Sequence, residues 1–192
     1  MLQIQCFCGI LIEGGIEMLQ STNPTAQRSQ QWIIQALLAL MEKKEYDKIS
    51  VSEICRKAQL DRRTFYRNFN SKQDVLEEYM RFLGEEYMEL YKTAKKPDNY
   101  TAAKIFFEFW SQHLYFIKNI KKCGLSAFVF DKFEKFTKEH TELLIGKDNL
   151  KVPLDYVFAY RIGGFWNAML VWATGEKSLS PHEMALIISQ IE

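Results

Sequence analysis

The 192-residue sequence predicts an all-α fold. Apolar residues recur three or four positions apart along the chain, which is the spacing of one face of a helix. No stretch keeps the alternation of apolar and polar residues that is typical of a half-buried strand. The four prolines, at positions 24, 97, 153 and 181, all fall at boundaries between predicted helices, where proline is tolerated. We expect a three-helix head, joined by a long fourth helix to a helical body.

The first helix is predicted over residues 28–44. A short linker at 45–50 separates it from the two helices that follow, and it would pack across their back. Its apolar side chains share one face: Ile33, Ala36, Leu37, Leu40 and Met41.

A pair of short helices is predicted after this linker. The first begins with a capping box at Ser50 and Glu53, whose hydroxyl and carboxylate can satisfy the exposed backbone amides of a helix start. Asp61 can cap the second helix in a similar way. Two short helices joined by a tight turn are typical of a helix-turn-helix.

The second helix of this pair has two different faces. Phe65 and Phe69, four residues apart, form an apolar inner face. Basic side chains lie opposite that stripe rather than around the helix, which favours a binding surface over an ordinary solvated helix. The outer face and the first turn hold Arg62, Arg63, Thr64, Tyr66 and Arg67.

The segment LDRRTFYRNFNSK, residues 60–72, resembles the TetR family of bacterial transcription regulators. In that family the second motif helix typically ends in a Thr-Phe-Tyr run followed by Phe and then Lys. One departure is Gln59, where the family usually has Gly; a left-handed cap there would cost Gln about 1 kcal/mol. The resemblance implies that the second helix enters the major groove of double-stranded DNA. It implies base-facing roles for Ser52, Arg62, Arg63 and Tyr66, and phosphate contacts from Thr64, Arg67, Asn68 and Lys72.

The charge distribution agrees with a head that binds DNA. Residues 28–75 contain ten Lys/Arg and six Asp/Glu, a net charge of +4. The remainder has 15 basic and 18 acidic residues, a net charge of −3, although the whole chain carries only +1. A basic head on a mildly acidic body is typical of a protein that touches nucleic acid with one part only.

A long fourth helix is predicted from a cap at Ser71 to about Lys96, where Pro97 would stop it. Its apolar face holds Val75, Leu76, Tyr79, Met80, Leu83 and Tyr87. We therefore assign residues 25–75 to the helix-turn-helix domain and 76–192 to the body. Further helices are expected at about 101–121, 124–128, 129–146, 153–175 and 181–191.

The body is rich in aromatic residues, which make a large core or a core opened into an apolar pocket. It holds 17 of the 27 aromatic residues between Tyr100 and Trp172. The segment from Tyr156 to Met184 resembles the C-terminal domain of a broad TetR-type subgroup of Gram-positive bacteria. A small apolar or aromatic effector is the expected ligand, and simple core packing is the alternative for each residue. The candidate pocket residues are Phe106, Trp110, His113, Phe130, Phe133, Tyr160 and Trp166.

The last two predicted helices are expected to form a homodimer. The helix at 153–175 is apolar around nearly its whole circumference, so either the body or a second chain must cover it. Two such helices from each subunit could pack as a four-helix bundle and place two heads side by side. The candidate interface residues are Ala159, Gly163, Leu170, Met184, Ile187, Ile188 and Ile191.

Other classes of function find little support in the sequence. It has no P-loop, no G-x-S-x-G, no H-E-x-x-H and no glycine-rich dinucleotide turn, so we expect no catalytic residues and no cofactor. Four scattered cysteines and three histidines indicate reduced thiols in a cytoplasmic protein rather than a metal site. The apolar run 156–174 could suggest a membrane segment, but Arg161 and Asn167 within it favour a buried helix.

Residues 1–24 are predicted to be an extension of the head. Codons for the Glu13-Gly14-Gly15 run can spell a ribosome-recruiting tract just upstream of Met18, so we expect translation to begin naturally at Met18.

Taken together, these features predict a DNA-binding transcription regulator. The leading interpretation is an effector-responsive repressor that binds a pseudo-palindromic operator as a homodimer. The alternatives are a regulator whose body binds a protein partner and an activator of an adjacent operon.

Overall fold

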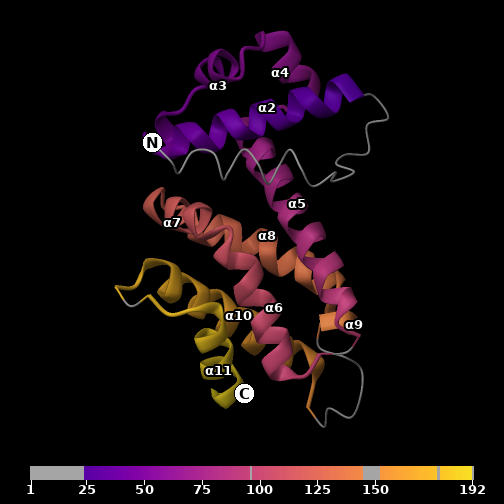
Figure 1. Cartoon of the computed structure of the whole chain (residues 1–192). Helices are drawn as coiled ribbons and strands as arrows, with labels where there is room; N and C mark the ends of the chain where they lie inside the picture. The colour runs from indigo at the N-terminus through magenta and orange to yellow at the C-terminus, as the bar shows by residue number, and fades with distance from the viewer. Residues whose placement is uncertain (1–23, 96, 145–151, 177, 192) are drawn as a thin grey trace.

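The computed structural model describes residues 24–95, 97–144, 152–176 and 178–191 (Figure 1). Within these ranges every regular element is a helix, so the all-α prediction is confirmed. The predicted N-terminal extension, with the proposed start at Met18, lies outside the described residues.

The head is built from α2 (Pro24–Met41), the 3₁₀ turn η1 (Tyr46–Lys48), α3 (Val51–Ala58) and α4 (Arg62–Asn68). Helix α2 packs on α3, α4 and the start of α5. The side chains between them are almost fully buried: Ile33, Leu37, Met41, Ile54, Phe65, Val75 and Leu76. This core fixes α3 and α4 relative to each other.

Helix α5 (Lys72–Thr93) runs from the head into the body (Figure 1). Its apolar face is buried along its whole length, from Val75 to Tyr91. It ends three residues before the predicted end at Lys96, and Ala94 forms the C-cap.

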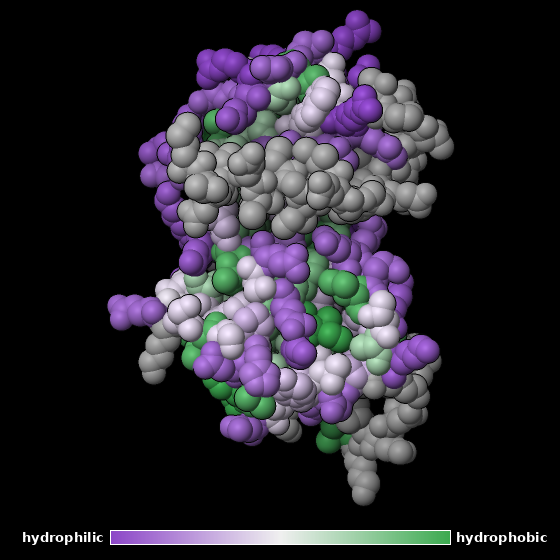
Figure 2. Space-filling model, viewed as in Figure 1, coloured by the Kyte–Doolittle hydropathy of each residue, from purple (hydrophilic) through white to green (hydrophobic). Residues whose placement is uncertain are grey.

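The body consists of α6 (Asn99–Ser111), α7 (Leu114–Lys122), α8 (Ser126–Glu139), α9 (Thr141–Leu144), α10 (Leu154–Thr174) and α11 (Pro181–Ile191). Helix α11 packs on α6, α10 packs on α7 and α8, and α8 packs on α5. In Figure 2 the head at the top of the view is largely hydrophilic, whereas apolar side chains surface at several points over the body.

Two helix boundaries in the body differ from the prediction. The helix expected at 101–121 is divided at Gln112 and His113, whose amides donate to the carbonyl groups three residues earlier. The separate helices expected at 124–128 and 129–146 are instead the continuous α8 followed by the short α9. Gly124, with φ +70°, makes the turn from α7, and α8 starts at Ser126 after the N-cap Leu125. The part of the second range beyond Leu144 lies outside the described residues.

Among the described residues, no helix is both long enough and apolar enough to cross a membrane.

Candidate nucleic-acid interface

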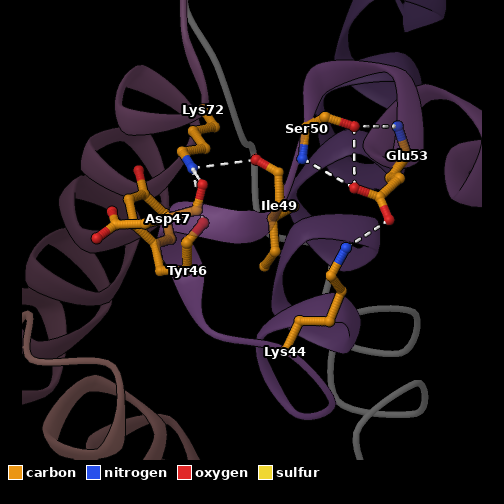
Figure 3. Close-up of polar contacts among 7 residues, drawn as sticks. All are labelled: Lys44, Tyr46, Asp47, Ile49, Ser50, Glu53 and Lys72. Atoms are coloured by element: carbon orange, nitrogen blue, oxygen red, sulfur yellow. Dashed lines mark hydrogen bonds and ion pairs between the residues drawn. The ribbon is translucent and has the colours of Figure 1, made fainter.

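The first motif helix is fixed at its start by side-chain capping. The Glu53 amide donates to Ser50 Oγ at 3.3 Å, and the Ser50 amide donates to Glu53 Oε2 at 3.0 Å, so the predicted capping box is confirmed (Figure 3). Lys44, after α2, approaches Glu53 Oε1 to 2.7 Å. This hydrogen bond, together with those from Ser50, lowers the pKa of Glu53 to about 2. The carboxylate therefore ties α3 to the end of α2 throughout the physiological pH range.

The turn between α3 and α4 is made by Gln59 in the left-handed conformation, with φ 56° and ψ 38°. The following amide, of Leu60, donates to the Cys55 carbonyl at 2.9 Å, which closes the end of α3. The chain thus adopts the backbone that normally favours glycine, although it has a side chain at this position.

Helix α4 is oriented by its cap and by one buried ring. Asp61 accepts a hydrogen bond from the Thr64 amide at 2.6 Å, and this bond lowers the pKa of the Asp61 carboxyl. Phe65 is fully buried, and its ring lies 6.1 Å from that of Phe69. Because Phe65 anchors one side of this seven-residue helix, the opposite side must face solvent.

That solvent-facing side carries the predicted basic residues. Arg62, Arg63, Tyr66 and Arg67 are all exposed, and 48% of Tyr66 is accessible. The Arg62 guanidinium donates to Tyr66 Oη at 3.4 Å and lies 5.8 Å from the centre of its ring. These two side chains therefore present one connected polar surface, while Arg63 lies beside them in the first turn.

The other predicted contacts flank this surface. Ser52 is exposed on α3, and Thr64 is half-buried in α4. The Asn68 side-chain amide donates to the Thr64 carbonyl at 2.7 Å, which leaves its side-chain oxygen as an acceptor. Arg56 is exposed one turn after Ser52, a residue that the sequence reasoning passed over although the i, i+4 spacing places it on the same face.

The ammonium group of Lys72, which was expected to contact a phosphate, is bonded to backbone carbonyl groups of the head. Its ammonium group donates to the carbonyl oxygens of Tyr46 at 2.6 Å, Ile49 at 3.0 Å and Asp47 at 3.2 Å (Figure 3). It also lies 4.4 Å from the centre of the Tyr46 ring. The amino group therefore ties the first turn of α5 to η1, and three acceptors already use its three protons.

Residues 33–79 match the family described as bacterial regulatory proteins, tetR family. The head therefore matches the tetR family. No curated protein matches the sequence.

Solved structures of TetR-family regulators share the fold over most of the chain, head and body included. One from Syntrophomonas wolfei has a TM-score of 0.65 at 18% identity and covers 85% of this chain and 92% of its own. One from Streptomyces coelicolor has a TM-score of 0.59 at 16% identity and covers 84% of this chain and 79% of its own. The dihydroxyacetone kinase operon activator DhaS has a TM-score of 0.56 at 17% identity, and the match covers 85% of this chain and 93% of the DhaS chain.

Most, but not all, of the candidate effector residues lie in the interior of the body. Phe106, Trp110 and His113 are buried, and Phe130 and Phe133 lie 5.6 and 5.8 Å from Trp166, ring centre to ring centre. Tyr160 is the exception, because 62% of it is exposed on the outer side of α10. Its residue type suggested a pocket, but its position on the helix turns it away from the buried aromatic residues.

The candidate dimer residues also divide into two groups. Ala159, Ile187 and Ile191 are exposed, and Gly163 and Leu170 are half-buried. Met184 and Ile188 are buried within the chain itself, on the side of α11 that packs into the body.

Among the residues that the structure describes, no group of three His, Cys, Asp or Glu side chains could hold a metal ion.

Proposed function

We propose that the chain is an effector-responsive repressor, which binds a pseudo-palindromic operator in double-stranded DNA as a homodimer in the cytoplasm. The observation that carries this proposal is the exposed basic side of α4, held outward by the buried Phe65. A helix presented in this way fits the major groove of B-form DNA.

Within the groove, Arg63 is the proposed reader of a guanine, because its guanidinium can donate two hydrogen bonds to one base edge. Arg62 and Tyr66 read the bases together, since their side chains are joined by a hydrogen bond. Ser52 adds a contact from α3. Thr64, Arg67 and Asn68 hold the phosphates, and Lys72 supports this surface by fixing the start of α5.

A homodimer is supported by the outer side of α10 and α11. Tyr156, Tyr160 and Val171 are 75%, 62% and 70% exposed, and α11 adds Ile187 and Ile191. A methyl group placed on Gly163 would meet nothing within 4 Å, so another helix has room to approach. Covering this apolar surface with a second copy would bury it and set two heads at the spacing of two half-sites.

The direct test measures operator affinity at fixed salt. An operator is first selected from random duplexes, and its binding is followed by fluorescence anisotropy. Arg63→Ala is expected to weaken binding by about 1–3 kcal/mol and to relax base preference at one position of each half-site. Lys138→Ala, which removes an exposed cation of the body, is the control and should bind normally. Equal affinities for the two variants would overturn the assignment of α4 to the groove.

An activator of an adjacent operon is the second candidate. It is favoured by the fold shared with DhaS, which is named as an operon activator. A promoter fused to a reporter separates the two: deletion of the gene raises expression under a repressor and lowers it under an activator. If the body binds a protein partner instead of an effector, small molecules would not change the expression of the reporter.

A further inference from the structure

One face of α10 is exposed and carries no charge. Residues on this face recur at helical spacing and form the α10 stripe: Tyr156, Tyr160, Gly164, Asn167 and Val171. The opposite face is buried in the body. Between Tyr156 and Thr174 the only charged residue is Arg161, which is half-buried and lies off the stripe. A solvated helix face normally carries charged side chains, so we expect another molecule to cover the stripe.

Gly163 and Gly164, the glycine pair, lie at the centre of the stripe. Glycine inside a helix is less favourable than alanine, because it loses more conformational freedom on folding. Both residues have φ values that other amino acids adopt, since Gly124 is the one described glycine with a positive φ. A Cβ atom on either glycine would have no atom of the described residues within 4 Å. Packing within one chain therefore does not require this pair, whereas a second helix could approach closely there.

The stripe is complementary to itself when two copies of α10 run antiparallel. Tyr160 and Asn167 each lie three residues from the nearer glycine of the pair, on opposite sides of it. Tyr156 and Val171 each lie seven residues from it. A two-fold axis through the glycine pair therefore places Tyr160 opposite Asn167 and Tyr156 opposite Val171, each twice. Each large ring then meets a smaller side chain, and a partner of different sequence would not require this equal spacing.

Asn167 supplies an acceptor for the Tyr160 hydroxyl across this axis. The Asn167 side-chain amide donates to the Gly163 carbonyl at 2.8 Å, which leaves the side-chain oxygen as an acceptor. The Tyr160 hydroxyl can donate to it. Tyr156, in contrast, faces Val171, whose side chain offers no acceptor. A polar pair within an uncharged interface selects one register, because any shift buries both groups without partners.

We propose that α10 packs antiparallel on α10 of a second copy of this chain, with the two-fold axis at the glycine pair and the Tyr160 hydroxyl donating to the Asn167 side-chain oxygen of that copy. The inference rests on the proposed homodimer, and it names the residues that set its register and its choice of partner. A partner without an acceptor opposite Tyr160 would bury that hydroxyl unpaired, and this penalty disfavours it.

Pairs of cysteines test the register. The double variants Tyr156→Cys with Val171→Cys, and Tyr160→Cys with Asn167→Cys, are made in a chain whose cysteines other than the buried Cys55 are serine. Mild oxidation should convert each double variant into a covalent dimer on a non-reducing gel. Each of the four single variants should run as a monomer, because identical residues lie roughly 10 or 22 Å apart along the helix axis. Both separations exceed the reach of a disulfide.

Removal of one hydroxyl tests the polar pair. Tyr160→Phe keeps the ring and should raise the dissociation constant of the dimer about thirtyfold, because two hydrogen bonds are lost. Sedimentation with fluorescence detection measures this constant without DNA. Tyr156→Phe, the matched control, should change it by less than about twofold. Asn167→Ala should weaken the dimer less in a Tyr160→Phe chain than in the native chain, because the two side chains share one interaction.

The outcomes separate this inference from the proposed function. A dimer in light scattering that gives no disulfide from either cysteine pair would overturn the register and leave the homodimer standing, as would covalent dimers of the single variants. Equal dissociation constants for Tyr160→Phe and Tyr156→Phe would overturn the hydrogen bond. A native chain that is monomeric at micromolar concentration would overturn both the register and the homodimer. The operator measurement with Arg63→Ala decides independently whether the head reads DNA.

Discussion

Replacing Lys72 by methionine separates a structural role of this residue from a DNA-binding role. Methionine keeps much of the side-chain length but removes the ammonium group that donates to three carbonyl oxygens. Hydrogen bonds to charged groups contribute about 1.5–3 kcal/mol each, but they share one donor, and the Asp47 carbonyl faces solvent and can bind water instead. Two part-buried acceptors therefore dominate, and we expect a loss of about 2–3 kcal/mol in the free energy of unfolding.

Urea denaturation of the free protein measures this loss, and Lys48→Met in the same head is the matched control. Lys48 is exposed and pairs with the exposed Glu45, so its replacement should change stability by less than about 0.5 kcal/mol. For folded Lys72→Met the salt dependence of operator binding should keep its slope. Unchanged stability, with a slope smaller by about one unit, would show that Lys72 holds a phosphate and would refute the structural reading.

Three further predictions concern the turn, the dimer and pH. Gln59→Gly removes a side chain from a left-handed position and should stabilise the chain by about 1 kcal/mol in urea denaturation; a loss of stability would mean that the Gln59 side chain makes a needed contact. Gly163→Glu should yield monomers in light scattering at micromolar concentration and weaken operator binding, whereas a dimer of unchanged mass would exclude α10 from the interface. His113 titrates below its ordinary pKa of 6.5 in the folded chain, at about 4, so the unfolded chain binds more protons between these values. The free energy of unfolding should therefore fall as the pH drops from 6.5 towards 4, and His113→Phe should flatten this dependence; identical pH profiles would contradict the burial of the ring.

The head could be predicted from sequence because its signals are local. A capping box joins residues only three apart, as at Ser50 and Glu53, and the two faces of α4 follow from spacing alone. The partners of Lys72 could not be predicted in this way, because the Tyr46 carbonyl is 26 residues away and any backbone carbonyl is an equally good acceptor.

In the body, the missed features depend on tertiary packing. The division between α6 and α7 contains neither Gly nor Pro, and apolar residues continue on both sides, so periodicity gave no reason for a stop at Gln112. Tyr160 has the same residue type as a core aromatic residue, and only the packing of α10 decides which of its aromatic side chains are buried. That the buried Trp110 indole has no acceptor among the described residues is likewise invisible in sequence, since it depends on how the body helices pack.

Helix α7 gives the head a second attachment besides α5. Lys122 at its end donates to the Glu42 carbonyl, just after α2, at 3.3 Å, while Lys121 donates to Thr174 at the end of α10. Phe116 packs against Tyr79 of α5 at 5.0 Å between ring centres. The head is thus attached to the body at two points, through α5 and through the hydrogen bond between Lys122 and Glu42. A rotation of the head about α5 must break this hydrogen bond. Any molecule that repositions the head must bind the form without this hydrogen bond more tightly than the form with it. The difference in binding free energy must be at least the free energy that the hydrogen bond contributes.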